Sequence, residues 1–279
     1  MAEVVSLKAP LGARIEGLER GRANEPAVAA LLNRALAEHL LVVTPGEPMT
    51  PEATLGFARA FGKPRTQLLR YKHSGATPEV SIMVSTLKTD GTTDKTAIRA
   101  EDWHTDDSYF AIPAKATLLH GIEIPSRGGA TWFCNMHSVY EALPETLRRR
   151  IDGLRSIHGY DTPRARNRPS ARTPQEIAET PDVEHPLVRT HPETGRKALY
   201  LNPNRQDRIV GLARAESDAL LDALTEHATQ PRYQYRHRWR QGDILIWDNR
   251  CTMHKANADY PAGSRRVMQR LMVAGTPPV

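Results

Sequence analysis

The sequence predicts a mainly β protein with peripheral helices, built as a β-sandwich or a jelly roll. Two helical patterns stand near the N-terminus, and most of the later sequence consists of short strand-like runs with one helical insertion. Turn glycines such as Gly242 and Gly263 separate these runs. Because no shift in composition divides the 279 residues, we expect a single domain over residues 1–279.

The N-terminal part of the chain contains two predicted helices around one strand. Residues 26–40 place apolar side chains at helical spacing, and Pro26 suits a first helical turn. The run LVVT at 41–44 follows at once and predicts a buried strand. A second helix is expected to begin at Thr50 and to end near Phe61.

The rest of the chain is expected to be mostly strands. Helices are predicted at 137–151, with a break at Pro144, and at 214–228. Strands are predicted at 116–124, 130–134, 197–201, 233–239, 243–248 and 265–273. The polar, proline-containing stretch at about 158–186 lacks a strong period, so we expect a lid-like or flexible insertion there.

Composition excludes several classes of protein. Hydrophobic residues make up 39% and charged residues 25%, which is ordinary for a globular protein and excludes collagen, a coiled coil and wholesale disorder. No apolar run approaches the roughly 18 residues that a membrane helix needs, and no signal peptide is visible. The two cysteines cannot form a disulfide framework. We therefore expect a cytoplasmic protein that does not enter a membrane.

The basic stretch at 148–172 raises the possibility of nucleic-acid binding. The formal net charge is +6, and eight arginines fall within this stretch. No aromatic residues alternate with these arginines to stack on bases, so a solvated helix end and loop is the favoured interpretation. We expect no nucleic-acid partner; binding that weakens steeply with salt would contradict this.

A candidate metal site begins with the sequence WHTDDS. Residues i and i+2 of a strand point to one side, so His104 and Asp106 are expected to present a nitrogen and an oxygen to the same point. His254, in WDNRCTMHKAN, is the strongest candidate for a third ligand. Two histidines and one carboxylate leave three coordination positions open, which is typical of non-haem Fe(II) oxygenases.

Two arginines on the last predicted strand indicate that an anion binds nearby. Arg266 and Arg270 lie four residues apart and so share a face of the strand. Burying them without anions is costly, and guanidinium binds carboxylates with two parallel hydrogen bonds.

These segments resemble the TauD/TfdA family, the taurine and 2,4-dichlorophenoxyacetate dioxygenases that depend on Fe(II) and 2-oxoglutarate. The matching blocks occur in order along most of the chain after residue 100: WHTDDSYF at 103–110, GGATWF at 128–133, VRTHPETGRKALYLN at 188–202, the segment 235–260 and RRVMQR at 265–270. The segment 41–64 also resembles the N-terminal region of the family.

The resemblance implies a role for each matching residue. Fe(II) would be bound by His104, Asp106 and His254. Arg266, helped by Thr131, would bind the distal carboxylate of 2-oxoglutarate, with Arg265 as the alternative if the alignment slips by one. The substrate would contact Arg270, Tyr71, Asn204 and Arg205. It further implies a double-stranded β-helix core of the jelly-roll, cupin-like type, and a homo-oligomer that is a dimer or a tetramer.

Departures from the taurine enzymes argue against taurine itself. Their asparagine four residues before the first iron ligand is Ala100 here, and their pocket histidine falls at Leu68. We therefore expect a dioxygenase that uses O2 to oxidise, most simply to hydroxylate, another small anionic organic substrate with release of succinate and CO2. A metal-dependent hydrolase or isomerase on the same barrel is the alternative, although it would not need the pair Arg266 and Thr131.

Overall fold

Two β-sheets packed against each other form the centre of the computed structural model, which describes residues 2–69, 73–74, 77–86, 101–165 and 170–279. Within these residues the larger sheet has nine strands, antiparallel except where β2 pairs with β3. Its order is β1 (Glu3–Ser6), β2 (Ala13–Glu16), β3 (Leu41–Thr44), β15 (Ile244–Asp248), β7 (Ala116–Glu123), β17 (Arg265–Val273), β6 (Thr77–Thr86) and β5 (His73–Ser74), with β4 (Pro64–Arg65) pairing β17 at its end.

The smaller sheet places β8 at its centre. Its order is β14 (Gln234–His237), β8 (Thr131–Asn135) and β16 (Thr252–Ala256). Two further groups of strands lie beside it: β10 (Val183–Pro186), β9 (Arg155–His158) and β13 (Gln206–Ile209) form one, and β11 (Val188–Thr190) pairs with β12 (Lys197–Leu199) in the other. The mainly β class predicted from the sequence is confirmed.

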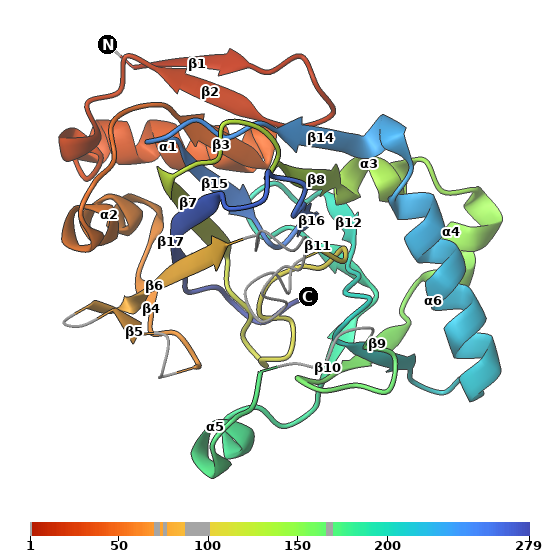
Figure 1. Cartoon of the computed structure of the whole chain (residues 1–279). Helices are drawn as coiled ribbons and strands as arrows, with labels where there is room; N and C mark the ends of the chain where they lie inside the picture. Colours follow the sequence, from red (N-terminus) through yellow and green to blue (C-terminus); the bar gives the residue numbers. More distant parts are fainter. Residues whose placement is uncertain (1, 70–72, 75–76, 87–100, 166–169) are drawn as a thin grey trace.

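Helices lie at the periphery on both sides of the sheets (Figure 1). Near the N-terminal strands are α1 (Pro26–His39) and α2 (Pro51–Ala58); beyond the smaller sheet are α3 (Met136–Glu141), α4 (Glu145–Ile151) and α6 (Arg214–Ala228), and α5 (Pro174–Ala178) stands apart from them. No helix in the described part of the chain has the length and apolar character needed to cross a membrane.

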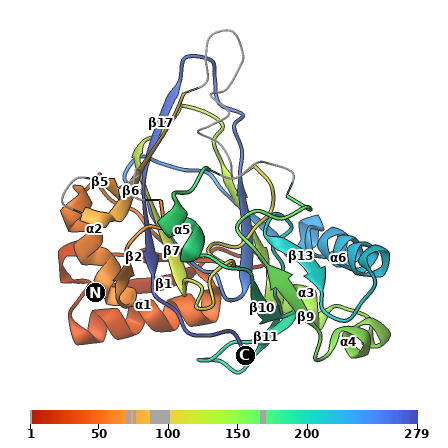
Figure 2. The same ribbon diagram turned by 90° about the horizontal axis from the view of Figure 1, so that it is seen from below.

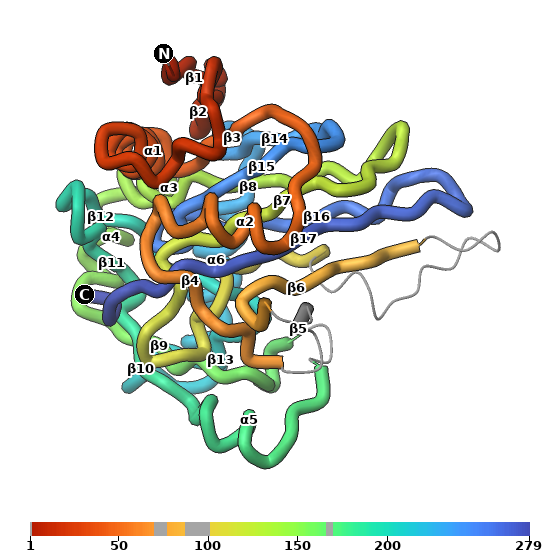
Figure 3. Tube along the Cα trace, turned by 90° about the vertical axis from the view of Figure 1, so that its left-hand side faces the viewer, coloured from red at the N-terminus to blue at the C-terminus, as the bar shows by residue number. Residues whose placement is uncertain are grey.

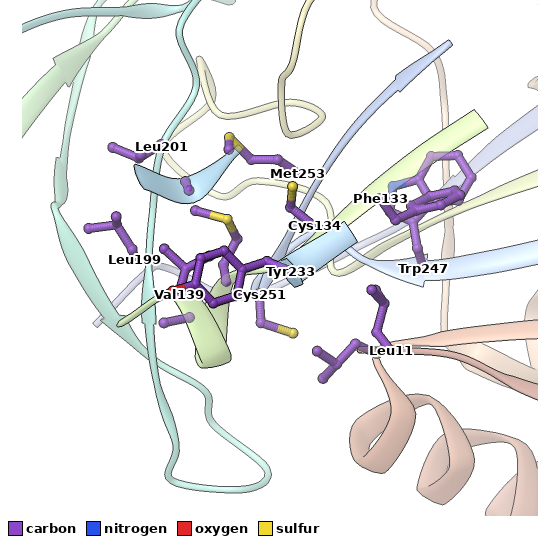
Figure 4. Packing of buried hydrophobic residues seen from close by; sticks show 14 of the residues in the cluster. Leu11, Phe133, Cys134, Val139, Leu199, Leu201, Tyr233, Trp247, Cys251 and Met253 are labelled. Carbon is purple, nitrogen blue, oxygen red and sulfur yellow. The ribbon is translucent and has the colours of Figure 1, made fainter. Parts of the chain in front are cut away.

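The central strands of the larger sheet, β3, β15 and β7, are buried on both faces, which explains their continuous apolar runs. On one face Val42 and Ile246 pack with Leu36 of α1 and with Phe57 of α2. On the opposite face, neighbouring residues such as Val43 and Leu245 belong to a second apolar cluster. Residues from the smaller sheet and from α6 form the rest of this cluster. In that cluster Phe133 of β8 lies 5.3 Å from Trp247 of β15, ring centroid to ring centroid (Figure 4). The two sheets are therefore held together by side chains from the strands that flank the candidate site.

Helix boundaries follow the signals in the sequence. Pro26 and Pro51 occupy first turns, and the side chain of Thr50 accepts a hydrogen bond from the N–H of Ala53 (3.2 Å). The helix expected at 137–151 is divided at Pro144 into α3 and α4. The boundaries predicted for residues 214–228 and 265–273 agree with α6 and β17.

Several strands were not predicted because their side chains lack the composition and spacing that are typical of strands. β16 and β13 are short and partly polar, and they become strands by pairing with β8 and β9. β6, in contrast, has a clear strand composition in TPEVSIMVST that the sequence analysis overlooked. The far ends of β6 and β17 project together beyond the helices, as Figure 2 and Figure 3 show.

The stretch 158–186 contains regular structure. Thr173 and Glu176 form a reciprocal capping box that begins α5, and β10 follows at Val183. Residues 166–169 lie outside the described residues. The expectation of a lid-like or flexible insertion stays a prediction.

Gly242 is required where the turn before β15 touches the loop after β3. Its φ is +83°, and a Cβ there would lie 1.8 Å from the carbonyl oxygen of Gly46. Gly211 has nearly the same φ, +82°, with nothing within 4 Å of a Cβ.

We expect Gly211→Ala to cost about 1–2 kcal/mol of unfolding free energy for the left-handed backbone alone, and Gly242→Ala about 1–3 kcal/mol more. Urea denaturation of both variants measures this; equal losses would show that the loop at Gly46 moves aside.

Candidate metal centre and its pocket

His104, Asp106 and His254 converge although about half the chain separates the first from the last. Each offers a ligand atom, and these atoms all lie within 4.8 Å of one another. Two backbone hydrogen bonds bring the segments together: the N–H of His104 donates to the carbonyl of His254 (3.0 Å), and the N–H of His254 donates back (2.7 Å). The convergence expected from the sequence is present.

The backbone at His104 and Asp106 differs from the strand that the sequence predicts there. Only His104 pairs in strand fashion, through the isolated bridge to His254, and the chain enters a turn at Asp106. Asp107 has a φ of +59°, so the chain continues through a left-handed residue. The expectation that His104 and Asp106 share one side of a strand is therefore wrong: the turn after the bridge brings the carboxylate to the imidazole.

Both imidazoles are prepared to offer a lone pair to a metal. The Nδ1 of His104 donates to the carbonyl oxygen of Asp102 (2.8 Å), which leaves its Nε2 lone pair facing Asp106 at 3.8 Å. Nδ1 of His254 is buried and has no hydrogen-bond partner within the described residues. Burial lowers the pKa of His104 and lowers that of His254 to about 3. Neutral imidazole is the form that binds metal ions.

A relay of hydrogen bonds orients the carboxylate of Asp106. The hydroxyl of Thr117 donates to Oδ2 of Asp106 (2.7 Å) and accepts from Nδ2 of Asn249 (2.9 Å). Oδ1 of Asn249 in turn accepts from the indole N–H of Trp247 (3.0 Å). Burial works to raise the pKa of Asp106, but the neighbouring imidazoles, the Arg270 guanidinium and the Thr117 hydrogen bond bring it below its ordinary value. The group is thus an oriented carboxylate, and the three residues suit a divalent metal.

The loop that holds Asp106 is fixed from the other side by Asn202. Its Nδ2 donates to the carbonyl of Thr105 (2.7 Å) and to the hydroxyl of Ser108 (2.8 Å), and the residue is fully buried. Neither Asn202 nor Thr117 was predicted from the sequence. Asn202 ends the segment LYLN, which carries only a family resemblance, and Thr117 stands in an ordinary apolar strand.

A second group of possible ligands serves the structure. His191, Asp248 and Cys251 also have ligand atoms within 4.8 Å of one another. Nδ1 of His191 accepts from two backbone N–H groups, and its Nε2 donates to Asp248 (3.1 Å). Arg250 donates to both oxygens of Asp248 (Nε to Oδ1, 2.8 Å; Nη2 to Oδ2, 2.5 Å). Because these groups are already satisfied, this cluster is an ion-pair network in the core.

A cavity of about 210 Å³ opens beside the first cluster. It lies on the inward faces of β6 and β17 and extends to the turn after β12. Its lining includes two metal-ligand candidates and four of the residues expected to bind small molecules: His104, Asp106, Asn204, Arg205, Arg266 and Arg270.

Arg266 presents a buried guanidinium to this cavity. It is 8% exposed, and its Nε and Nη2 have no hydrogen-bond partner within the described residues. Burial lowers the pKa of Arg266 to about 10, so the group stays charged at pH 7. Arg265 is exposed and pairs with Glu123, as expected for the opposite face of the strand. Arg266, not Arg265, therefore faces the cavity.

Thr131 reaches Arg266 indirectly. Its buried hydroxyl accepts a hydrogen bond from the indole N–H of Trp239 (2.9 Å), and the Trp239 ring centre lies 5.8 Å from the Arg266 guanidinium carbon. Sequence analysis missed Trp239, whose position in the run YRHRWRQ gave no sign of its orientation.

Three of the four residues that were expected to contact the substrate line the cavity, and the fourth lies outside the described residues. Arg270 donates through Nη2 to Oε1 of Gln67 (3.0 Å), and its Nε has no partner within the described part of the chain. Asn204 and Arg205 line the cavity, and Oδ1 of Asn204 has no hydrogen-bond partner among the residues that the structure describes. Tyr71 lies outside the described residues, as does Ala100.

This fold and site define a metal-dependent enzyme whose pocket is lined by arginines. A family model described as "Taurine catabolism dioxygenase TauD, TfdA family" matches residues 3–272. The chain belongs to this family, and it is an alpha-ketoglutarate-dependent dioxygenase.

Three similar proteins illustrate the relationship. The chain is 32% identical over 248 residues to an alpha-ketoglutarate-dependent 2,4-dichlorophenoxyacetate dioxygenase of Cupriavidus pinatubonensis, covering 86% of each chain. It is 32% identical over 280 residues to an alpha-ketoglutarate-dependent sulfate ester dioxygenase of Pseudomonas putida, covering 96% of this chain and 88% of the relative. The crystal structure of AAD-2 with Mn(II) and N-oxalylglycine is similar with a TM-score of 0.81 and 30% identity, covering 100% of this chain and 99% of that one.

The core ion pair predicts how stability depends on pH. Burial works to raise the pKa of Asp248, but Arg250 and His191 hold it well below its ordinary value. The unfolded state then binds more protons, so this contribution is present above about pH 4 and is lost as the pH falls further. We expect Asp248→Asn to cost about 3–5 kcal/mol at pH 7, because Arg250 loses a buried partner, and to flatten the loss of stability below pH 4.

Urea denaturation between pH 7 and pH 3 measures both effects. Glu141→Gln is the control, because Glu141 pairs with Arg196 at an exposed site and should cost at most about 1 kcal/mol. A pH profile of Asp248→Asn parallel to that of the wild type would contradict the assignment.

Proposed function

We propose that His104, Asp106 and His254 bind Fe(II) and that the adjoining cavity receives 2-oxoglutarate and a small anionic substrate. When bound, Fe(II) and 2-oxoglutarate supply the oxidising chemistry with O2, releasing succinate and CO2. The donor set supports this metal, because two imidazoles and one carboxylate leave open positions for a chelating keto acid. The relay behind Asp106 and the carbonyl of Asp102 fix the ligand atoms before a metal arrives.

The unpaired guanidinium of Arg266 is the observation that favours an oxygenase over a hydrolase or an isomerase. A buried cation without a compensating anion costs several kcal/mol of stability. The distal carboxylate of 2-oxoglutarate offers two parallel acceptors, which match the free Nε and Nη2 of Arg266. Trp239 covers the same guanidinium and connects it to Thr131. A hydrolase or an isomerase with the same three ligands has no use for this group.

The substrate is proposed to be an anion other than taurine, bound by Arg270 with contacts from Asn204, Arg205 and Tyr71. Relatives named for 2,4-dichlorophenoxyacetate and for sulfate esters support an organic acid. Leu68, which replaces the histidine expected in taurine enzymes, is one of the lining residues of the cavity. An aliphatic side chain there favours a substrate whose uncharged part is apolar. We propose that the enzyme hydroxylates this substrate.

We further propose that the two packed sheets are the double-stranded β-helix core of a single domain. Antiparallel pairing of β3, β15, β7 and β17 opposite β14, β8 and β16 supports this topology. Tyr160 and Ser170 line the cavity, which supports a lid-like role for the segment 158–186. A cytoplasmic location, a dimeric or tetrameric assembly, and the absence of nucleic-acid or membrane partners stay predictions.

The metal assignment is tested by spectroscopy without turnover. Anaerobic addition of Fe(II) and 2-oxoglutarate should give a weak visible charge-transfer band, and His104→Ala should abolish it because one of three protein ligands is lost. His39→Ala, at the end of α1 and outside the cavity, is the control and should keep the band. An unchanged band in His104→Ala would remove this residue from the ligand set.

The cosubstrate assignment is tested by a pair of neighbouring variants. Arg266→Ala should remove about 2–3 kcal/mol of charge-assisted hydrogen bonding and raise the half-saturating concentration of 2-oxoglutarate roughly 30- to 160-fold. Arg265→Ala removes an exposed guanidinium and should leave this value nearly unchanged. Succinate release against 2-oxoglutarate concentration measures both, and the reverse order would show that Arg265 is the binding residue.

A further inference from the structure

Besides Arg266 and Arg270, the cavity contains a third guanidinium, that of Arg205, which no carboxylate of the described residues neutralises. Arg205 lies with its guanidinium carbon 4.6 Å from the ring centre of Tyr160 and 5.6 Å from that of Tyr109, and Nη1 donates to the backbone carbonyl of Tyr160. No acidic side chain within the described residues forms an ion pair with it. Burial lowers the pKa of Arg205, with Tyr109, Tyr160 and Asp161 opposing the shift.

Arg205 and Arg270 face the same space from different parts of the fold. Arg270 belongs to β17, and Arg205 follows β12; both line the cavity. His104 and Tyr109 line the same cavity, and the guanidinium carbon of Arg205 lies 5.6 Å from the ring centre of Tyr109. The two guanidiniums therefore face one space that also contains a proposed metal ligand.

The charges of the proposed metal centre balance without these two arginines. A divalent metal and Arg266 together cancel the carboxylate of Asp106 and the two carboxylates of 2-oxoglutarate. Asp107, the other acid on the cavity, forms an ion pair with Arg65 (3.4 Å) and accepts from the hydroxyl of Tyr109 (3.1 Å).

Other charged groups lie near Arg205 outside the cavity. Asp161 acts to raise the pKa of Arg205 and Arg172 acts to lower it, and the guanidinium carbon of Arg172 lies 4.2 Å from the same Tyr160 ring. Within the described residues neither Arg205 nor Arg270 forms an ion pair, so these two positive charges are assigned to the substrate.

We propose that the substrate is a small organic dianion whose negative charges are shared between Arg270 and Arg205. This rests on the proposed function and narrows its substrate class. An anion with one charge would leave one partly buried guanidinium without compensation, and such a charge is costly. The rings of Tyr109 and Tyr160 offer flat apolar surface beside Arg205. The chemistry suits two separate acid groups on one carbon skeleton, or one doubly charged phosphonate.

Binding to a complex that cannot turn over tests the charge preference directly. The wild-type protein is loaded with Mn(II) and N-oxalylglycine, an isostere of 2-oxoglutarate, and is titrated calorimetrically with phenoxyacetate, 4-carboxyphenoxyacetate or phenylphosphonate. We expect at least one dianion to bind about 10- to 100-fold more tightly than phenoxyacetate, the range of one added charge-assisted contact. The two dianions distinguish separated charges from a single doubly charged group. Equal affinity of all three probes would overturn the proposal.

Variants of Arg205 test the residue itself. Arg205→Gln should remove most of the preference for the dianion and change phenoxyacetate binding by less than about twofold, and Arg205→Lys should keep part of the preference. Arg172→Gln is the matched control, because Arg172 contacts the same tyrosine ring but is not a lining residue; it should keep the full preference. Equal weakening of both probes in Arg205→Gln, or an effect of Arg172→Gln of the same size, would overturn the assignment.

The same titrations separate this inference from the proposed function. If N-oxalylglycine does not bind the manganese-loaded protein, the proposed function fails and this inference fails with it. If N-oxalylglycine binds and the probes show no charge preference, only the dianion proposal fails.

Discussion

The candidate site depends on one pair of backbone hydrogen bonds, those exchanged between His104 and His254. They attach the loop before β7 to β16, and β16 is itself fixed by its pairing with β8. Behind His254, Phe133 and Trp247 fill the space between the two sheets. The packing between the sheets therefore holds β16 in place, and with it the two imidazoles that its backbone hydrogen bonds bring together.

The treatment of buried arginines distinguishes the core from the cavity. Arg250 is neutralised on both edges by Asp248 and Glu193, and it serves stability. Arg266, in contrast, is nearly as buried, and its Nε and Nη2 have no hydrogen-bond partner among the described residues and face the cavity. Arg189 is also buried without an ion pair in the described part of the chain, but it lies outside the cavity, with its guanidinium carbon 5.3 Å from the ring centre of Tyr200. Among the cavity residues, Arg266 carries the cost of a buried cation next to the proposed metal ligands. That contrast, more than the number of arginines, is the reason for assigning anion binding to the cavity.

An element could be predicted from the sequence when the pattern of its own side chains determines it. It could not be predicted when strand pairing or other tertiary contacts determine it. The helix at 214–228 and the strand at 265–273 were predictable because their apolar side chains follow one period, and the face shared by Arg266 and Arg270 followed from that strand. The three ligand candidates were predictable from residue type. The turn at Asp106, the position of Trp239 between Thr131 and Arg266, and the burial of Arg205 were not, because tertiary contacts determine each of them.

The placement of two indoles gives the protein its own optical reporters. Trp247 lies 4.6 Å from the ring of His254 and donates into the relay that ends at Asp106, whereas Trp239 lies against Arg266. One fluorophore is thus next to the metal ligands and the other next to the proposed keto-acid subsite. Emission from single-tryptophan versions of the chain would follow the two loading events separately, without any added dye.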